Sequence, residues 1–491
     1  MNLLQKKKKS SAIKRIEKNY NRCKIRNNKG TKRICENCQD ECLATLFCEL
    51  CVRNYLKSNF LNWTSGNNDI DNLIQQCQME TLVPCRIIEW IPYNKLQNIK
   101  YLTKGGCSEI YEAYWIDGRY YEWDSKEKQL NRNNRQYVVL KKLKNIESAN
   151  RSWFEEGKSH LSISNKYGGI AQCFGLTKDP SDENFMLVMS YMNANLREYL
   201  QQNYNKLTWK ERIQIINDIT LALSQIYKGG AIHRDLHSGN VLFQQKIQTF
   251  RISDLGFCGP PDKPLNSIYG NLPYIAPEVI SGKETTFASD IYSIGILMWE
   301  ISSGQPPFLC KHNYDLAIKI INGMRPKIIP GTPLKYKELM EQCWDADPTK
   351  RPNAITLIKE LSNIYSYYLN NNEQQQIISD NFQMNSNFNV NSSSINSFSD
   401  EVFSSKVYTF QNMPEPRNAT KEEQAYHSIQ LDFDLRDGLI TGTLTANLKG
   451  IILMVDDEKE SYVNSKKIKL NNNKGDDENL NLERDELKIS F

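Results

Sequence analysis

The chain has 491 residues, a formal net charge of +5 and 13 cysteines. It is too long for one ordinary domain, and its net charge is mild for its size. No apolar run approaches the ~18 to 20 residues that a membrane span requires, and lysines stand where a secretory signal would have its apolar core. Without an export signal, the cysteines indicate reduced thiols or metal ligands instead of disulfides. We therefore expect a protein of the cytoplasm or the nucleus.

The first 33 residues are strongly basic. They hold thirteen Lys or Arg residues and one acidic residue, Glu17. Such a run is either a solvated, disordered tail or a segment that binds nucleic acid, an acidic membrane or a nuclear importer. Lys6–Lys9, followed by Lys14 and Arg15, has the composition of a nuclear localisation signal.

Residues 34–52 contain a cysteine cluster. Cys35 and Cys38 form one C-x2-C pair, and Cys48 and Cys51 form a second pair nine residues later. Paired thiolates at this spacing can bind a tetrahedral Zn²⁺ and, with four of them, leave no open coordination position, so the zinc would be structural. The alternative is a set of scattered core cysteines. Two further cysteines could replace one ligand: Cys23 and Cys42.

Residues 53–92 mix aromatic and apolar residues, which predicts one or two helices leading to a domain that begins near residue 93. In that domain Gly105 and Gly106 lie between two short β-like runs. The charged stretch 115–136 predicts an extended, solvated surface loop. It precedes Tyr137–Lys141, an apolar, β-branched run ending in lysine that is typical of a buried strand.

Helical patterns follow. Trp153–Lys158 contains Gly157, which within a helix would cost on the order of 1 kcal/mol relative to Ala and would make that helix a candidate mobile element. Thr208 and Glu211 form a capping box ahead of isoleucines and leucines at helical spacing, and this run ends at residues 229–230.

Ordered polar motifs come next. His233-Arg234-Asp235 opens a segment that reaches Asn240, and Asp254-Leu255-Gly256 begins fourteen residues further on. The residues after Asp290 are apolar all round, which predicts a buried helix. The motifs of the second half are Ala276-Pro277-Glu278, Asp290–Gly295, Cys343-Trp344 and Arg351-Pro352.

The order and spacing of these motifs resemble a eukaryotic-type protein kinase over roughly residues 93–365. The His-Ser-Gly after Asp235 is similar to the tyrosine-kinase-like group, and the layout resembles fungal kinases that carry a Cys-rich segment ahead of the kinase domain. The resemblance implies an α+β, bilobal kinase fold with a small β-rich N-lobe and a larger helical C-lobe. A zinc-ribbon-like segment would precede it and a disordered tail would follow.

The resemblance also implies catalytic roles. Asp235 would orient a substrate hydroxyl and accept its proton, while Asn240 and Asp254 would hold Mg²⁺ beside the phosphates of ATP. Lys141 would hold the α- and β-phosphates. Its carboxylate partner would be Glu156, with Glu155 as the alternative because the flanking residues do not fix the register.

For ATP binding, the resemblance implies a glycine-rich lid and a hinge. Only Gly105 keeps the lid's Gly-x-Gly-x-x-Gly register, with Gly106 beside it, so we expect weakened but not abolished ATP affinity. Met189 would guard the back pocket, and Ser190, Tyr191 and Met192 would offer backbone groups to adenine. The lid residues are Thr103, Lys104, Gly105, Gly106, Cys107, Ser108 and Ile110.

Structural and regulatory roles follow in the same way. Asp290 would hold the catalytic-loop backbone around His233, and Arg351 would form an ion pair with Glu278. The activation segment, residues 254–278, contains few acceptors. A phosphate there would pair with Arg234 and order the segment, and the candidate acceptors are Ser267 and Tyr269.

Three functions remain open. The first is an active protein kinase of intracellular signalling that acts on protein substrates. The second is a pseudokinase scaffold, suggested by the depleted glycine lid. The third is a nucleic-acid binder that uses the basic and cysteine-rich residues 1–60. For an active kinase, Tyr274-Ile275 before Ala276 favours Ser/Thr acceptors, with dual specificity as the alternative.

The C-terminal part, residues 366–491, has no clear core pattern. Of the 31 residues from 370 to 400, 20 are Asn, Gln or Ser, a composition that cannot bury a core. Short β-prone runs follow, and then a loose charged stretch. We expect this part to be low in complexity and mostly disordered.

Overall fold

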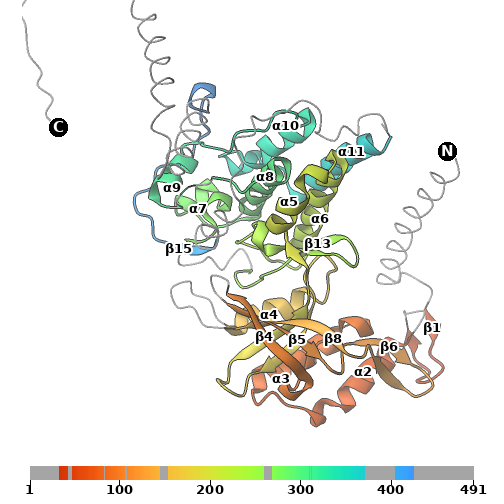
Figure 1. Ribbon diagram of the computed structural model, residues 1–491. Helices are drawn as coiled ribbons and strands as arrows, with labels where there is room; N and C mark the ends of the chain where they lie inside the picture. Colours follow the sequence, from red (N-terminus) through yellow and green to blue (C-terminus); the bar gives the residue numbers. More distant parts are fainter. Residues whose placement is uncertain are drawn as a thin grey trace, which may run out of the picture. The chain divides into compact units, whose positions relative to one another are not determined.

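The computed structural model describes residues 32–42, 47–81, 83–104, 108–143, 153–258, 268–308, 310, 312–370 and 404–424 (Figure 1). All of them fall within the first of two compact units of the chain, residues 1–428. The expectations for residues 1–31, which include Cys23, for residues 105–107 and for Ser267 lie outside these ranges.

A six-stranded sheet forms the N-terminal lobe, with the spatial order β3-β9-β10-β8-β5-β4. All neighbours are antiparallel except β3 and β9. Side chains alternate across β8, so Val138 and Leu140 enter one core while Lys141 lies on the opposite face. The strands are β3 (Glu89–Trp90), β4 (Leu96–Lys104), β5 (Glu109–Trp115), β8 (Gln136–Lys142), β9 (Cys173–Lys178) and β10 (Phe185–Ser190).

Two helices, α3 (Asn68–Glu80) and α4 (Trp153–Ile163), pack on this sheet (Figure 1). Ile70 and Ile74 of α3 and Leu161 of α4 are fully buried in one cluster with Leu187 of β10. Burying each such side chain contributes about 1.5–3 kcal/mol. Because the linker helix α3 belongs to this core, the lobe is continuous with residues that precede the predicted domain start.

The linker also adds a strand to the sheet. β3 runs parallel to β9, and Glu89 lies opposite Gly175. Gly175 has φ +153°, and a Cβ there would lie 1.8 Å from the Glu89 carbonyl oxygen, so only glycine permits this approach. The buried Glu89 side chain is held by Arg132, whose guanidinium lies 2.5 Å from Oε2.

The prediction of an extended solvated loop over residues 115–136 is wrong. These residues form a hairpin of β6 (Tyr120–Asp124) and β7 (Gln129–Arg132). Trp123 and Leu130 are buried against Val52 and Leu56 of α2 (Glu49–Ser58). The two apolar residues stand among charged ones, so the local sequence does not indicate their burial. Their partner helix lies about 70 positions earlier in the chain.

The C-terminal lobe is mainly helical. Its central helix α8 is buried along almost its whole length, as predicted from its all-round apolar sequence. The predicted capping box at Thr208 and Glu211 is present at the start of α6, and Gly229 caps its end. The helices are α5 (Leu196–Asn203), α6 (Trp209–Lys228), α7 (Pro277–Ile280), α8 (Phe287–Ser303), α9 (Tyr314–Ile321), α10 (Leu334–Cys343) and α11 (Ala354–Asn370).

Short strands complete the described chain. β11, β12 and β13 form a three-stranded sheet, in which β12 follows the loop of residues 233–240, and β1 and β2 form a ribbon in the cysteine segment. No helix among the residues described is long and apolar enough to cross a bilayer. The strands are β1 (Arg33–Ile34), β2 (Glu41–Cys42), β11 (Ala194–Asn195), β12 (Val241–Gln244), β13 (Thr249–Ile252), β14 (Ile268–Gly270) and β15 (Lys406–Tyr408).

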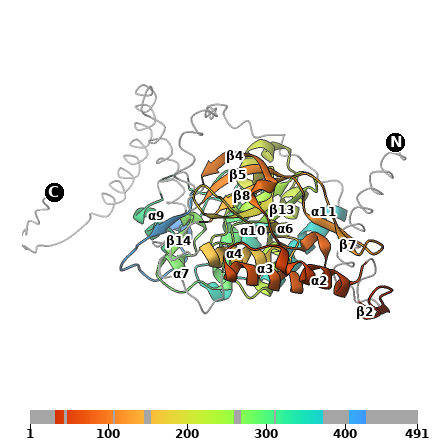
Figure 2. The ribbon, with the colours of Figure 1, turned by 90° about the horizontal axis from the view of Figure 1, so that it is seen from below.

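Residues 404–424 are an exception to the loose tail expected over 366–491. They pack on the C-terminal lobe, and β15 pairs antiparallel with β14. Figure 2 shows this blue segment beside β14, in the region of α7 and α9. The tail prediction failed for this segment because a strand of three residues becomes ordered only when another strand supplies its hydrogen-bond partners.

Candidate active site

Lys141 stands at the centre of a buried charged cluster. Its Nζ lies 2.8 Å from Oε1 of Glu156 and 2.8 Å from Oδ1 of Asp254. Glu156 is buried on α4 and Glu155 is exposed, so the structure selects Glu156 from the two alternatives. The cluster joins a strand, a helix and the turn after β13.

His160 connects the same helix to the same turn. It is fully buried one helical turn after Glu156, and its Nε2 accepts a hydrogen bond of 3.2 Å from the Leu255 backbone N–H. His160 belongs to none of the motifs identified in the sequence. Its only signal was the i, i+4 spacing from Glu156, which places both side chains on one face of α4.

Asp290 of α8 holds the loop of residues 233–240 in place. The Asp290 carboxylate accepts hydrogen bonds from the backbone N–H groups of His233, at 2.8 Å, and Arg234, at 2.9 Å. Burial raises the pKa of Asp290, while His233 and these two N–H groups oppose that shift. The expected contact between Asp290 and the loop backbone is therefore present.

The loop and the turn both contain strained backbone. Arg234 has φ +70° and Asp254 has φ +51°, a region that residues other than glycine seldom adopt. The His233 ring Nε2 lies 3.0 Å from the Ser253 carbonyl oxygen and so ties the two segments together. Strain of this kind persists only where the surrounding contacts enforce it, and it concentrates at functional sites.

Asp235 and Asn240 lie side by side. The Asn240 side-chain amide donates to the Asp235 carbonyl oxygen at 2.9 Å and lies 3.4 Å from Asp235 Oδ2. His237 Nε2 lies 3.8 Å from Asp235 Oδ1, and its Nδ1 accepts from the Gly239 N–H at 3.1 Å. Burial lowers the pKa of His237, so the neutral imidazole is favoured.

A polar network supports the loop from the other side. The Tyr274 hydroxyl lies 3.3 Å from Ser238 Oγ and donates to Glu300 at 2.5 Å. Arg197 donates to Glu300 and to the Tyr274 hydroxyl, both at 3.4 Å. Arg197 and Glu300 have no predicted role, because they come from α5 and α8, more than a hundred positions apart.

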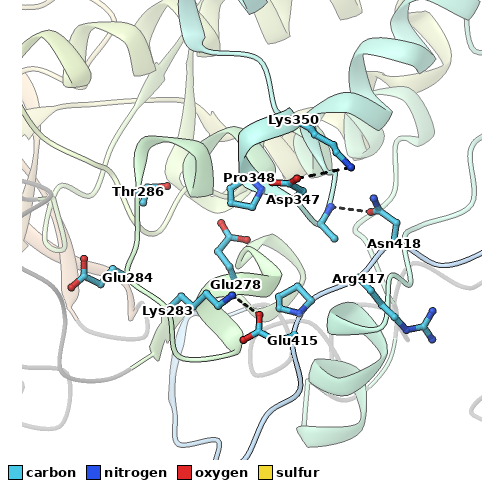
Figure 3. A pocket seen from close by; sticks show the side chains of 12 residues that line it. Glu278, Lys283, Glu284, Thr286, Asp347, Pro348, Lys350, Glu415, Arg417 and Asn418 are labelled. Carbon is cyan, nitrogen blue, oxygen red and sulfur yellow. Dashed lines mark hydrogen bonds and ion pairs between the residues drawn. The ribbon is translucent and has the colours of Figure 1, made fainter.

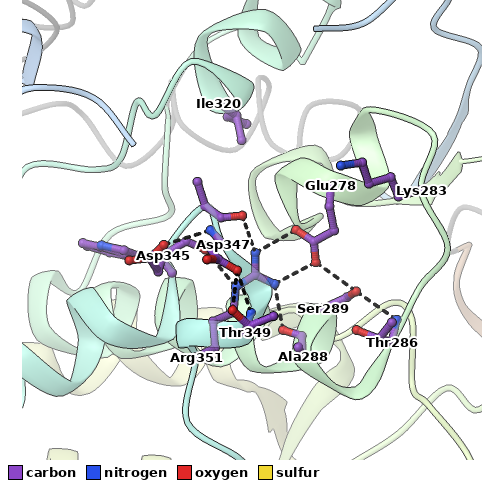
Figure 4. A network of polar contacts seen from close by, with 12 residues as sticks. Glu278, Lys283, Thr286, Ala288, Ser289, Ile320, Asp345, Asp347, Thr349 and Arg351 are labelled. Atoms are coloured by element: carbon purple, nitrogen blue, oxygen red, sulfur yellow. Dashed lines mark hydrogen bonds and ion pairs between the residues drawn. The ribbon is translucent and has the colours of Figure 1, made fainter. Parts of the chain in front are cut away.

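The predicted ion pair between Arg351 and Glu278 is present and bidentate, with two N–O distances of 2.7 Å (Figure 4). The Arg351 guanidinium also donates to the carbonyl oxygens of Ala288, at 2.9 Å, and Asp345, at 2.8 Å. Ser289 donates to Glu278 Oε1 at 3.2 Å. This network fixes the end of the activation segment to the base of α8.

The expected nucleotide-binding residues are partly described. Thr103 pairs with Ile110 and Lys104 with Glu109 across β4 and β5, on either side of the lid. Ser108 is buried. At the hinge, Met189 is buried at the end of β10, with Met192 packed against the same core; Tyr191 packs on Tyr137 with ring centroids 4.7 Å apart.

The expected phosphate switch at Tyr269 disagrees with the structure. Tyr269 is buried and stacks on Phe257, with ring centroids 3.7 Å apart. The Arg234 guanidinium donates to the Phe257 carbonyl oxygen, at 3.2 Å, and to Thr285, at 3.1 Å. A phosphate on Tyr269 would require this stack to open first, which sequence spacing alone could not indicate.

The four predicted cysteine ligands come together. Sγ atoms of Cys35 and Cys51 are 3.7 Å apart, those of Cys38 and Cys48 are 3.6 Å apart, and all four lie within 4.8 Å of one another. Zn–S bonds of about 2.3 Å in a tetrahedron imply S–S separations of about 3.8 Å. Cys42 is buried beside this set but is not one of the four.

A sheet-rich lobe, a helical lobe and a Lys–Glu–Asp cluster facing an Asp–Asn loop define the protein kinase class. The sequence model of the family described as protein tyrosine and serine/threonine kinase matches residues 96–361, more than half of the chain. The chain therefore belongs to this family.

Individual relatives match over the same region. A protein named dual specificity protein kinase zakA, from Dictyostelium discoideum, is 31% identical over 197 residues, which cover 36% of this chain and 25% of that protein. A human protein named dual serine/threonine and tyrosine protein kinase is 32% identical over 195 residues, which cover 39% of this chain and 20% of that protein. The chain thus spans a quarter or less of the length of these relatives.

Proposed function

We propose that the chain transfers the γ-phosphoryl group of ATP, with Mg²⁺, to hydroxyl groups of proteins in intracellular signalling. The observation that carries this proposal is the cluster of Lys141, Glu156 and Asp254, with both Nζ–carboxylate distances at 2.8 Å. Two carboxylates hold the Lys141 ammonium in one position, from which it can bind phosphate oxygens of ATP. Asp235 and Asn240 then supply the remaining polar groups of the site.

The donor set fits magnesium. Mg²⁺ prefers oxygen ligands, and Asp254 and Asn240 supply a carboxylate and an amide oxygen. When bound, the ion would neutralise charge on the β- and γ-phosphates. Lys141 would orient the α- and β-phosphates, and Asp235 would orient the attacking hydroxyl and take its proton.

Serine or threonine is the favoured acceptor, with dual specificity next. Tyr274-Ile275 before Ala276 resembles serine/threonine kinases, although His237 replaces their usual Lys and Asn271 their usual Thr. Relatives named dual specificity kinases support the alternative. Phosphoamino-acid analysis of a mixed peptide library tests this choice, and a product consisting mainly of phosphotyrosine would contradict it.

A pseudokinase scaffold is the second candidate, and the depleted glycine lid favours it. The two functions separate in an assay with γ-radiolabelled ATP on the full-length chain. An active kinase transfers the radiolabelled phosphate to itself or to a peptide when Mg²⁺ is present, and this transfer stops when EDTA is added. A preparation that binds ATP and transfers no phosphate to itself or to a peptide library would support the scaffold.

We also propose that Cys35, Cys38, Cys48 and Cys51 hold one structural Zn²⁺. The close approach of the four sulfur atoms supports this proposal. The segment is too small for an ordinary core, so metal would supply its folding free energy. It also contacts the kinase lobe, because the Asn37 side chain donates to the Ser125 carbonyl oxygen of the β6–β7 hairpin at 3.1 Å.

A further inference from the structure

Residues 404–424 enter the active site. The Ser405 hydroxyl donates a hydrogen bond of 2.8 Å to Asp235 Oδ1 and lies 3.2 Å from Nε2 of His237. Asp235 is the carboxylate expected to accept the proton of a substrate hydroxyl. A serine of the same chain thus occupies the position that a substrate serine would take.

The neighbouring backbone is bound as a substrate strand would be. β15 pairs antiparallel with β14 of the activation segment, with Lys406 opposite Gly270 and Tyr408 opposite Ile268. Adding an extended segment to an exposed strand is a common mode of peptide recognition, in which main-chain hydrogen bonds fix the register. That register determines which side chain reaches the catalytic loop.

Gly270 keeps the entrance to Asp235 open. It has φ +143°, and a Cβ at this position would lie 3.3 Å from Asp235 Oδ1 and 3.2 Å from Ile275 Cγ1. Asp235 Oδ1 is the atom that Ser405 reaches. A side chain at residue 270 would therefore crowd the carboxylate on the side from which the hydroxyl approaches.

Aromatic contacts hold the segment after β15. Tyr408 is buried, and its ring stacks on Phe410 with centroids 5.4 Å apart. Phe410 in turn meets the edge of Tyr314 on α9, with centroids 6.2 Å apart. Aromatic pairs of this kind contribute beyond the burial of their area, so they anchor the strand immediately beyond Ser405.

A second anchor lies beside α7, at a cavity of about 730 Å³ that residues 415–418 help to line (Figure 3). Ser281 donates to the Pro414 carbonyl oxygen at 2.8 Å, and Lys283 forms an ion pair with Glu415. The Asn418 side chain accepts from the Ala346 N–H at 2.9 Å and donates to Asp345 at 3.0 Å.

Residues at the end of α9 accommodate the backbone of this anchor. The Arg417 N–H donates to the Ile321 carbonyl oxygen at 3.0 Å. Beside it, Gly323 has φ +94°, and a Cβ there would lie 2.0 Å from the Ala419 nitrogen. The docked backbone therefore requires glycine at residue 323, which indicates a built docking surface and not a casual contact.

We propose that Ser405 is a phosphorylation site of the chain's own kinase domain, with residues 404–419 docked as a substrate in cis. This proposal rests on the proposed function. The Ser405 Oγ–Pγ bond forms, the bond from Pγ to the β,γ-bridging oxygen of ATP breaks, ADP leaves, and the hydroxyl proton passes to Asp235. Residues 371–403 join this segment covalently to α11, so its docking is an intramolecular step.

The product differs from the substrate in charge. A phosphate on Ser405 carries about −1.5 to −2 charges beside the Asp235 carboxylate, and like charges at this distance repel. Phosphorylation therefore releases β15 from β14 and frees Asp235 for other substrates. Before that step, the docked segment competes with other substrates for access to Asp235.

The test is phosphosite mapping of the purified full-length chain incubated with MgATP, with a serine peptide from a mixed library as an external acceptor. We expect phosphate on Ser405 with a first-order rate constant that does not change as the enzyme is diluted. Ser405→Ala removes this site and Ser404→Ala leaves it intact. An apparent first-order rate constant that rises with enzyme concentration, or external transfer with Ser405 unmodified, would overturn the proposal. No transfer to any acceptor would overturn the proposed function as well.

The anchor supplies a matched pair of variants. Asn418→Ala removes two hydrogen bonds of the docked segment and should slow Ser405 phosphorylation by about tenfold, without slowing transfer to the external peptide. Gln411→Ala, at an exposed position of the same segment, should change neither rate. Equal slowing of both acceptors by Asn418→Ala would show that residue 418 supports the fold and not the docking, against the proposal.

Discussion

Lys141 illustrates how single residues set the chemistry. One ammonium faces two carboxylates in a buried site, so the local charge is about −1. Isolated charges are costly to bury, and an excess negative charge is most readily compensated by a cation. A divalent ion near Asp254 would provide that compensation, which is a physical reason for expecting magnesium here.

Replacing Glu156 by Gln tests this cluster. The variant keeps the side-chain shape but removes one carboxylate, so Lys141 is drawn towards Asp254 alone. Hydrogen bonds to charged groups contribute about 1.5–3 kcal/mol, and we expect kcat/KM for peptide phosphorylation to fall by about 10- to 100-fold. The control is Glu155→Gln, an exposed neighbour that should retain activity. Equal activity of both variants would remove Glu156 from the site.

At the scale of the element, α4 connects the lobes. It carries Glu156, which reaches Lys141 of β8, and His160, which holds Leu255 after β13. Any displacement of the helix would therefore break contacts to a strand and to the turn after β13 together. Gly157, between these two residues, lowers the stability of the element that carries both.

The variant Gly157→Ala should stabilise the protein. A Cβ at residue 157 would lie 3.8 Å from Leu143 Cδ1, an ordinary contact, and alanine gains about 1 kcal/mol over glycine within a helix. The urea midpoint of unfolding should rise. Gly295→Ala in α8 is the contrasting control, because its Cβ would lie 3.0 Å from Cys343 Cβ and 3.1 Å from the Trp344 nitrogen. That crowding should lower the midpoint, and a rise for both variants would refute the packing argument.

The cysteine segment is a second element with a clear test. Native mass spectrometry of the full-length chain should find one Zn²⁺ per molecule, and Cys38→Ser should lose it because three thiolates and a hydroxyl bind zinc less tightly. Cys42→Ser should keep the metal, since Cys42 is outside the group of four. Zinc-free wild-type protein with an intact fold would contradict the site.

For the whole molecule, the features that could be predicted from the sequence are those that depend on residues close together in the chain. The contacts of Asp290 with the catalytic loop and of Arg351 with Glu278 were predictable, because the motifs that carry them are short and come in a fixed order. Glu156 was left open against Glu155, since helical register depends on packing and not on neighbours. The cysteine group was predictable from spacing alone.

Other features depend on contacts between distant parts of the chain. Trp123 and Leu130 become buried only because α2 lies against their hairpin. The network of Arg197, Tyr274 and Glu300 joins three separate segments. Residues 404–424 show the same effect most strongly, because β15 has order only through β14 and the anchors on the C-terminal lobe. No pattern within about ten residues of these positions contains that information.

The central claim, phosphoryl transfer through Asp235, is tested most directly by Asp235→Asn in the full-length chain. ATP binding and phosphate transfer to a peptide library should be measured on the same preparation, with the exposed Asp69→Asn as the matched control. We predict that Asp235→Asn binds ATP like the wild type while transfer falls by about 10²-fold or more, because the hydroxyl loses its proton acceptor. Wild-type transfer by Asp235→Asn would contradict the account.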